Sequence, residues 1–105
     1  MERDIPFDDQ FKEALLEGRK VATARYKKYA ERDDHFRQFG QKFRVIAVLR
    51  IPLRALWPLY QLEGVGSEGE LKALWWSLHP RRKRNEDARI WVYIFQREPP
   101  LVADA

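Results

Sequence analysis

The sequence contains no cysteine, and it has only five glycines and two histidines among 105 residues. Small secreted domains usually carry disulfides, so the lack of cysteine favours the reducing cytoplasm. It also excludes metal sites built from thiolates and any cysteine nucleophile. The histidines, His35 and His79, lie far apart without the spacing of metal ligands, so we expect each to be a surface or capping residue. We expect no metal and no other cofactor.

Long apolar runs are also missing, and the first six residues lack the apolar segment of a secretion signal. Glycine-rich phosphate loops and dinucleotide-binding signatures are absent, because Gly18 has no spaced glycine partner. We therefore expect a soluble cytoplasmic protein that does not use either of these motifs.

A chain of 105 residues has room for one domain and no second core. We expect that domain to span residues 1–98 and the proline-containing segment 99–105 to be a flexible tail. Aromatic residues make up 13% of the chain, and their large side chains suit a compact core. The sequence does not indicate an oligomeric state.

In the first half of the chain, the apolar pattern predicts one helix and two strands. Asp8 is the expected N-cap of a helix whose apolar residues recur at helical spacing until Gly18 ends it. A short strand is expected at 21–25, and 43–51 is the most strand-like segment of the sequence. The charged stretch 26–40 is expected to be mainly loop, with a strand near 36–39.

The second half predicts a bent connection, a helix and a strand. Pro52 and Pro58 interrupt residues 53–62, where a short helix is expected to begin at Pro58. Ser67 and Glu70 form a capping box for a helix that ends at Leu78. Residues 89–96 are a second strong strand with two apolar faces. Two or three helices packed on these strands define an α+β fold, and the pattern is compatible with closure into a small β-barrel.

Lysine and arginine number 20 against 16 acidic residues, for a formal net charge of +4. The basic residues gather in two clusters, one formed by Arg19, Lys20, Arg25, Lys27 and Lys28 and the other by Arg81, Arg82, Lys83 and Arg84. Separated basic clusters interleaved with aromatics favour a phosphate-bearing partner such as RNA. The alternative is that the charge only keeps the protein in solution.

Chemistry is most expected in the segment 18–25, where a helix ends on glycine and a strand follows. Alternate side chains of a strand share a face, so Thr23 and Arg25 are expected to point the same way. A hydroxyl beside an ammonium and a guanidinium can bind an anion or become a nucleophile. The alternative is that Lys20 and Arg25 are solvated and Thr23 only fills the strand.

Glu63, followed by Gly64 at the end of an apolar segment, is the other candidate for a site residue. Its carboxylate can point into a cleft. The alternative is that Gly64 ends a helix and Glu63 is a surface residue.

In order and spacing, these segments resemble the ASCH domain, a family related to the PUA domains of RNA-modifying proteins. The motif that carries the resemblance is glycine–x–lysine–x–x–threonine after the first helix, found as Gly18, Lys20 and Thr23, with an arginine at Arg25. Further matches are the helix at 11–17, the segment 34–36, the strand at 43–49, the Glu63-Gly64 pair, the helix leading to 78–80 and the strand at 90–95. Asp33 stands where the family usually has a glycine.

The resemblance implies a small PUA-like β-barrel with packed helices and a cleft beside the motif. It implies binding of RNA or a nucleoside-like ligand in that cleft; a membrane partner is not expected, because no apolar run is long enough to span a membrane. The residues expected to contribute to binding are Gly18, Arg19, Arg25, Arg81, Arg82 and Arg84.

Some members of the family are amidohydrolases that deacylate N4-acetylcytidine and related nucleosides. By resemblance, Thr23 would be the nucleophile, Lys20 its activator and Glu63 the acid or base. Near pH 7 that role requires the pKa of Lys20 to fall by about three units from about 10.4. Burial beside Arg25 would lower this pKa, and an ion pair with a glutamate would raise it.

Three hypotheses about function follow, and ligand binding is favoured over hydrolysis. The third is that Trp57, Trp76 and Trp91 form a protein interface. At least some of these aromatics are expected in the core instead, because both faces of the last strand are apolar.

Overall fold

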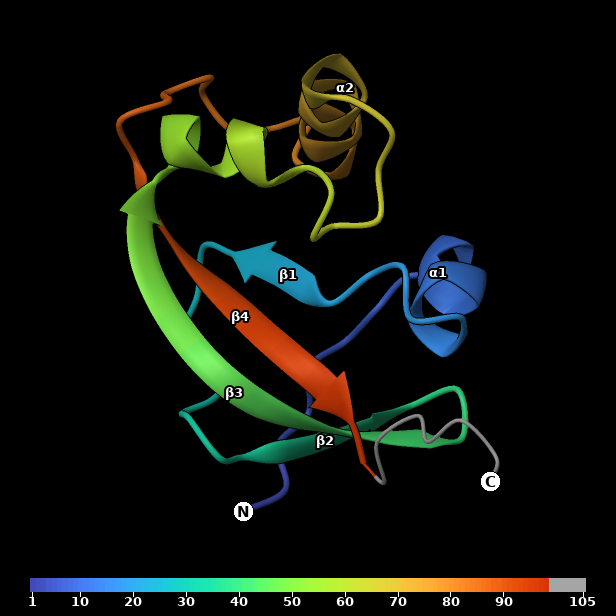
Figure 1. Ribbon diagram of the computed structural model, residues 1–105. Helices are drawn as coiled ribbons and strands as arrows, with labels where there is room; N and C mark the ends of the chain where they lie inside the picture. The colour runs from blue at the N-terminus through green and yellow to red at the C-terminus, as the bar shows by residue number, and fades with distance from the viewer. Residues whose placement is uncertain (99–105) are drawn as a thin grey trace.

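The computed structural model describes residues 1–98, so the predicted tail at 99–105 lies outside the described residues. Its elements are η1 (Asp9–Phe11), α1 (Lys12–Leu16), β1 (Ala22–Arg25), β2 (His35–Gln38), β3 (Gln41–Pro52), η2 (Leu53–Leu59), α2 (Glu68–Leu78) and β4 (Arg89–Arg97). The strands form one antiparallel sheet in the order β1-β4-β3-β2. The sheet curls into a half-barrel, with α2 and η2 side by side beyond β1 and α1 beside the start of β1 (Figure 1). The α+β class and the barrel-like curvature predicted from the sequence are confirmed.

Strand β4 lies between β1 and β3, and apolar side chains pack against both faces of this strand. Ile90 and Val92 are fully buried in the cluster that packs against η2 and α2. Tyr93 and Phe95 are buried in a second cluster with Phe36 and other apolar residues. Alternate residues of a strand point to opposite faces, so an apolar run on both sets predicts a central strand.

The helix starts follow the capping predictions closely. The Asp8 carboxylate accepts a hydrogen bond from the Gln10 amide at 3.1 Å, which confirms Asp8 as an N-cap. The Ser67 hydroxyl accepts from the Glu70 amide at 3.1 Å. The Glu70 carboxylate reaches back to the Gly66 amide at 3.1 Å, one residue before the position that a capping box normally uses.

One local prediction was wrong, and another was off by one residue. The helix expected to begin at Pro58 is instead a 3-10 helix that begins at Leu53 and contains Pro58. It starts there because the loop before β4 supplies two acceptors: the Leu53 amide donates to Ala88 and the Arg54 amide to Glu86, both at 2.9 Å. The strand expected near 36–39 lies one residue earlier, at His35–Gln38.

The β2–β3 hairpin explains that shift. Phe39 and Gly40 have φ of 53° and 81°, so the two turn residues leave the strand conformation together. Two-residue hairpins use such left-handed pairs because their twist matches that of the strands. Asp33, which stands where a glycine was expected, also adopts a left-handed φ of 72°. An aspartate tolerates this conformation at some cost.

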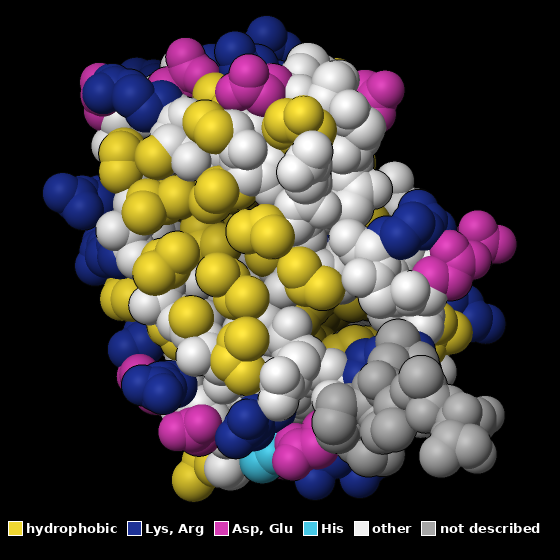
Figure 2. Space-filling view, viewed as in Figure 1, with side chains coloured by type: hydrophobic (Ala, Val, Ile, Leu, Met, Phe, Trp, Pro, Cys, Tyr) yellow, Lys and Arg dark blue, Asp and Glu magenta, His cyan; other side chains and the backbone are white. Residues whose placement is uncertain are grey.

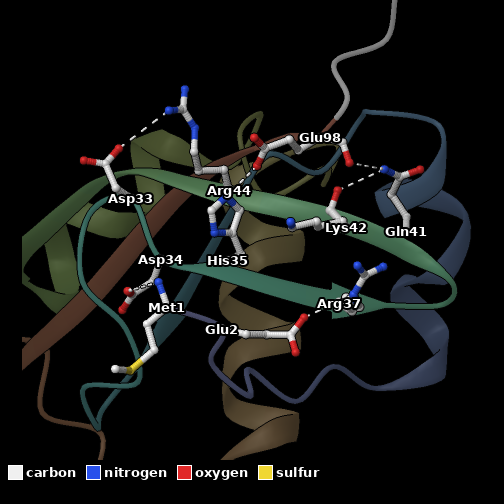
Figure 3. A network of polar contacts seen from close by, with 10 residues as sticks. All are labelled: Met1, Glu2, Asp33, Asp34, His35, Arg37, Gln41, Lys42, Arg44 and Glu98. Carbon is white, nitrogen blue, oxygen red and sulfur yellow. Dashed lines mark hydrogen bonds and ion pairs between the residues drawn. The ribbon is translucent and has the colours of Figure 1, made fainter.

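The first residues of the chain are fastened to β2 through Asp34, a buried residue (Figure 3). The amino group of Met1 lies 3.5 Å from one carboxylate oxygen, and Arg3 Nε donates to the other at 3.0 Å. The amide of Glu31 also donates to this carboxylate, at 2.8 Å. The Glu31 amide, and then Arg3, lower the pKa of Asp34 because they stabilise its charged form, although burial acts in the opposite direction.

Hydrophobic side chains gather over the centre of the face shown in Figure 2, with Lys and Arg around its rim. On β3, Ile46 and Leu49 are 36% and 38% exposed. Among the described residues, no helix has the length and apolar character needed to cross a membrane.

Candidate functional site

The turn after α1 directs Lys20 into the interior. Gly18 adopts a φ of 79°, a left-handed conformation that favours glycine. The amides of Arg19 and Lys20 both donate to the carbonyl of Ala14, at 2.9 and 3.0 Å, so the chain reverses direction directly after the helix. Lys20 is 3% exposed, and its Nζ lies 4.9 Å from the ring centroid of Phe11. The alternative in which Lys20 is solvated is therefore wrong.

A second turn, at 62–64, packs directly against Lys20. The carbonyl of Leu62 accepts from the amides of Val21 and the following residue, at 2.8 and 3.0 Å. Gly64 has a φ of 76°, and a Cβ at this position would lie 3.1 Å from Lys20 Cβ. Glycine alone satisfies both the conformation and the close approach. The turn thereby brings Glu63, which is 7% exposed, to the buried lysine.

Lys20 and Glu63 form a buried ion pair, with Nζ 2.5 Å from Oε2. Burial lowers the pKa of Lys20 below its ordinary value, more than the charge of Glu63 and its hydrogen bond raise it; Arg25 lowers it further. The other carboxylate oxygen, Oε1 of Glu63, is buried and accepts no hydrogen bond within the part of the chain that the structure describes. A buried oxygen without a donor is costly, so a ligand N–H or O–H would be stabilised there.

Strand β1 holds the hydroxyl and guanidinium of the motif together. Arg25 Nη1 donates to Thr23 Oγ1 and to the carbonyl of Ala24, and Nη2 donates to the carbonyl of Pro6 at 2.7 Å. Thr23 is 1% exposed. Within residues 1–98, no hydrogen bond joins Thr23 to Lys20, whose ammonium is bound to Glu63 instead. The hydroxyl is therefore held by Arg25 and not by its expected activator.

A cavity of about 200 Å³ lies at this edge of the sheet. Lys20, Thr23, Arg25 and Glu63 all line it, so the structure brings these four predicted residues to one site. Gly18 and Arg19 do not line this cavity, and Gly18 acts by shaping the turn before Lys20. The remaining walls are mainly apolar and come from the segment before α1 and from α2, notably Pro6, Phe11, Leu71, Leu74, Trp75 and His79.

Aromatic rings close the cavity at the end of α2. The ring of His79 lies 4.4 Å from that of Trp75 and 5.0 Å from that of Tyr26, centroid to centroid. Trp75 Nε1 donates to the Tyr26 hydroxyl at 3.3 Å. Burial, and then the charges of Arg82 and Arg25, lower the pKa of His79 from 6.5. The imidazole is therefore neutral at pH 7 and offers one donor and one acceptor.

No family model matches the sequence, and no curated protein matches it. Solved structures do match its fold. The crystal structure of the hypothetical protein PH0355 superposes with a TM-score of 0.72 at 14% identity, covering 92% of this chain and 99% of that chain. The ASCH domain from Lactobacillus crispatus JV V101 superposes with a TM-score of 0.66 at 14% identity, covering 91% of this chain and 78% of that chain. The chain has the ASCH-domain fold.

Within this ASCH fold, sequence reasoning missed Trp75 and His79 as cavity residues. Trp75 lies within the predicted helix that ends at Leu78, and a surface or capping role is expected for His79. His79 is indeed the C-cap of α2, but it also lines the cavity. The available signal was the small side chain of Ala24 on β1, which lines the cavity together with large apolar residues of α2.

The first predicted basic cluster does not form one exposed patch on the ASCH fold. Lys20 is buried, and the Arg19 guanidinium binds Glu17 at 2.8 Å. Lys28 pairs with Glu31. The first cluster is therefore divided between a buried lysine and more exposed residues, two of which pair with acids.

The second basic cluster follows α2, and its four side chains are exposed. Within residues 1–98, none of them forms an ion pair. Arg81, Arg82 and Lys83 line a second recess together with Tyr26. Arg84 lies outside both cavities, with its guanidinium 5.5 Å from the ring centroid of Trp76.

The three tryptophans expected at a protein interface do not form a common exposed surface. Trp57 is 4% exposed and belongs to the core. Trp76 and Trp91 are half-buried, and the charged ends of Lys28 and Arg50 lie 4.9 and 4.8 Å from the Trp91 ring centroid. The interface hypothesis gains no support from this arrangement.

The other histidine is distant from the cavity. His35 lies on β2, with Nε2 2.7 Å from Glu98 Oε2 (Figure 3). Residues 1–98 contain no group of three or more His, Asp or Glu side chains that could hold a metal ion.

Proposed function

We propose that this protein is a member of the ASCH family and binds a nucleobase, in RNA or in a nucleoside-like ligand, in the cavity between β1 and α2. The observation that carries the proposal is the unpartnered Oε1 of Glu63, buried beside the Lys20 ammonium in a cavity with an aromatic wall. Nucleobases combine apolar faces with polar edges, and this cavity offers both kinds of contact. The cysteine-free composition supports a cytoplasmic location.

The size of the cavity supports a single ring system as its occupant. Pockets for drug-sized molecules enclose roughly 300–1,000 Å³, whereas this cavity encloses about 200 Å³. A base fits this description better than a whole nucleotide does. Glu63 Oε1 would accept a hydrogen bond from an exocyclic amine, which cytosine, adenine and guanine carry, or from the N3–H of uracil. The proposal therefore predicts that a base with its donor edge towards Glu63 binds in the cavity.

The test is a titration of isotope-labelled protein with the four ribonucleosides and with short single-stranded RNA, followed by two-dimensional NMR at low salt. Saturable shifts are expected at Thr23, Glu63 and His79. Asp87→Asn serves as a control that removes an exposed carboxylate outside the cavity. Shifts that are absent, or that occur only away from the cavity, for every nucleoside and RNA tested would refute the proposal.

Hydrolysis of an acylated cytidine is a second candidate, supported by the presence of Thr23, Lys20 and Glu63 around one cavity. In that reaction, Thr23 Oγ1 bonds to the acyl carbon, its proton passes to a neutral Lys20, and the acyl C–N bond breaks as the amine takes up a proton. Water then releases the acid from the threonine ester. Two contacts would first have to open, because Lys20 Nζ is bound to Glu63 and Thr23 Oγ1 is held by Arg25. Binding therefore stays the first proposal.

A further inference from the structure

A recess lined by Tyr26, Arg81, Arg82 and Lys83 lies next to the cavity. Tyr26 directly follows Arg25, which lines the cavity, and its ring lies 5.2 Å from that of Trp75. The Tyr26 side chain therefore separates two sites of different character, one mainly apolar and the other basic.

The acidic residues in the loop before β4 do not neutralise this recess. The Glu86 carboxylate accepts a hydrogen bond from Trp57 Nε1, and Asp87 pairs with Arg54 of η2. Both acids are thus engaged by η2 residues, while Arg82 and Lys83 make no ion pair among residues 1–98. A recess with several unneutralised cations attracts an anion.

Arg82 is also held in place by the structure. Its guanidinium lies 3.7 Å from the centroid of the Tyr26 ring. Its amide donates to the carbonyl of His79 at 3.2 Å, which fixes the turn after α2. A guanidinium stacked on an aromatic face keeps its N–H edge available, and that edge matches the geometry of a phosphate.

We propose that this recess is a phosphate subsite, so that the preferred ligand is a nucleotide and not a free nucleoside. The inference rests on the proposed function, because the cavity would take the base. A base that fills about 200 Å³ leaves its sugar and phosphate outside the cavity. Arg82 and Lys83 would bind that phosphate. A terminal phosphate and a phosphodiester share this chemistry, and the experiment distinguishes them.

The experiment compares calorimetric titrations of each ribonucleoside, its 5′-monophosphate, its 3′-monophosphate and the corresponding dinucleotides at one low salt concentration. A charge-assisted hydrogen bond is worth enough for a gain of about tenfold or more, so at least one monophosphate should bind that much tighter than its nucleoside. A dinucleotide that binds as tightly as the better monophosphate would indicate a strand as the natural ligand. Weak dinucleotide binding would indicate a terminal phosphate.

Two single-residue variants test whether the recess causes the gain in affinity for the monophosphate. Arg82→Gln should remove most of the phosphate advantage, measured as the ratio of nucleotide affinity to nucleoside affinity within the variant. The matched control is Arg50→Gln. Arg50 is also an exposed arginine whose guanidinium lies over an aromatic ring, that of Trp91, but it lines neither cavity. Arg50→Gln changes the net charge by the same amount as Arg82→Gln. Because Arg50 does not line the recess, this variant should preserve the phosphate advantage.

The outcomes separate this inference from the proposed function. Nucleosides and monophosphates that bind equally well would overturn the phosphate subsite and leave base binding intact. A phosphate advantage that survives Arg82→Gln combined with Lys83→Gln would overturn the assignment to this recess. Failure of every nucleoside and nucleotide to bind would overturn both proposals.

Discussion

Lys20 Nζ lies 2.5 Å from Glu63 Oε2 in the interior of the protein, although the two residues are 43 positions apart in the sequence. Removing one partner from such a pair leaves an uncompensated buried charge and typically costs about 3–5 kcal/mol, whereas replacing both with apolar groups is often neutral or stabilising. Stability alone therefore does not account for this pair. Under the proposed function, the pair has a second role in the cavity, which is to hold Glu63 ready for a ligand.

We predict that Lys20→Met and Glu63→Met each lower the free energy of unfolding by about 3–5 kcal/mol, and that the double variant regains most of this loss. Urea unfolding of the four proteins measures the effect. The double variant should fold without binding a nucleoside or nucleotide. If it is as unstable as the single variants, the pair is a requirement of the fold, and the argument that it is retained for binding fails.

The same pair predicts a dependence of stability on alkaline pH. Burial lowers the pKa of Lys20 in the folded protein, while the unfolded chain keeps a value near 10.5. Between these two pKa values the unfolded state binds more protons, so the contribution of Lys20 to the free energy of unfolding rises with pH and levels off above 10.5. The measurement is urea unfolding of the wild type and the Lys20→Met, Glu63→Met double variant across this range. The prediction would be contradicted if the free energy of unfolding of the wild type, relative to that of the double variant, stays constant or falls with rising pH.

Gly64 allows a test of the turn that positions Glu63. Gly64→Ala must adopt a left-handed φ, which costs about 1–2 kcal/mol, and its Cβ would also meet Lys20 Cβ at 3.1 Å. Gly40→Ala is the matched control, because Gly40 has a φ of 81° and open space around the added Cβ. We predict that Gly64→Ala costs more stability than Gly40→Ala in urea unfolding, and that it alone weakens ligand binding. Equal costs would mean that the close approach to Lys20 has no energetic consequence.

Much of the architecture was predictable from the sequence, because its signals are local. Ser67 and Asp8 cap helices through their own side chains, and the continuous apolar run of β4 favours a central strand. The glycine motif placed Lys20 in a turn before a strand, where the structure also has it. These features depend on neighbours within a few residues, so a sequence pattern describes them well.

The remaining features depend on contacts between distant segments. The 3-10 helix η2 begins at Leu53 because a loop more than thirty residues later supplies its acceptors. Lys20 and Arg19 are adjacent in the sequence, yet one is buried with Glu63 and the other is exposed with Glu17. Composition cannot separate two neighbouring cations of this kind, so the sequence could not show which members of the first basic cluster are exposed. His79 was likewise hidden, because its role depends on the cavity formed between α2 and β1.

Thr23→Val separates binding from catalysis. Valine preserves the branched shape and removes only the hydroxyl, and Arg25 Nη1 retains the Ala24 carbonyl as an acceptor at 2.8 Å. We therefore expect the variant to fold and to bind a nucleoside with only a modest loss of affinity. In an amidohydrolase, the same change would abolish the release of acetate from N4-acetylcytidine, because among the described residues that line the cavity no other side chain carries a hydroxyl. Acetate release by the wild type and by Thr23→Val is the measurement. Turnover by the wild type that disappears in the variant would establish the hydrolytic reaction. Turnover that persists in Thr23→Val would exclude Thr23 as the nucleophile.

We expect binding without turnover, because Lys20 Nζ donates to Glu63 and so has no lone pair directed at the Thr23 proton.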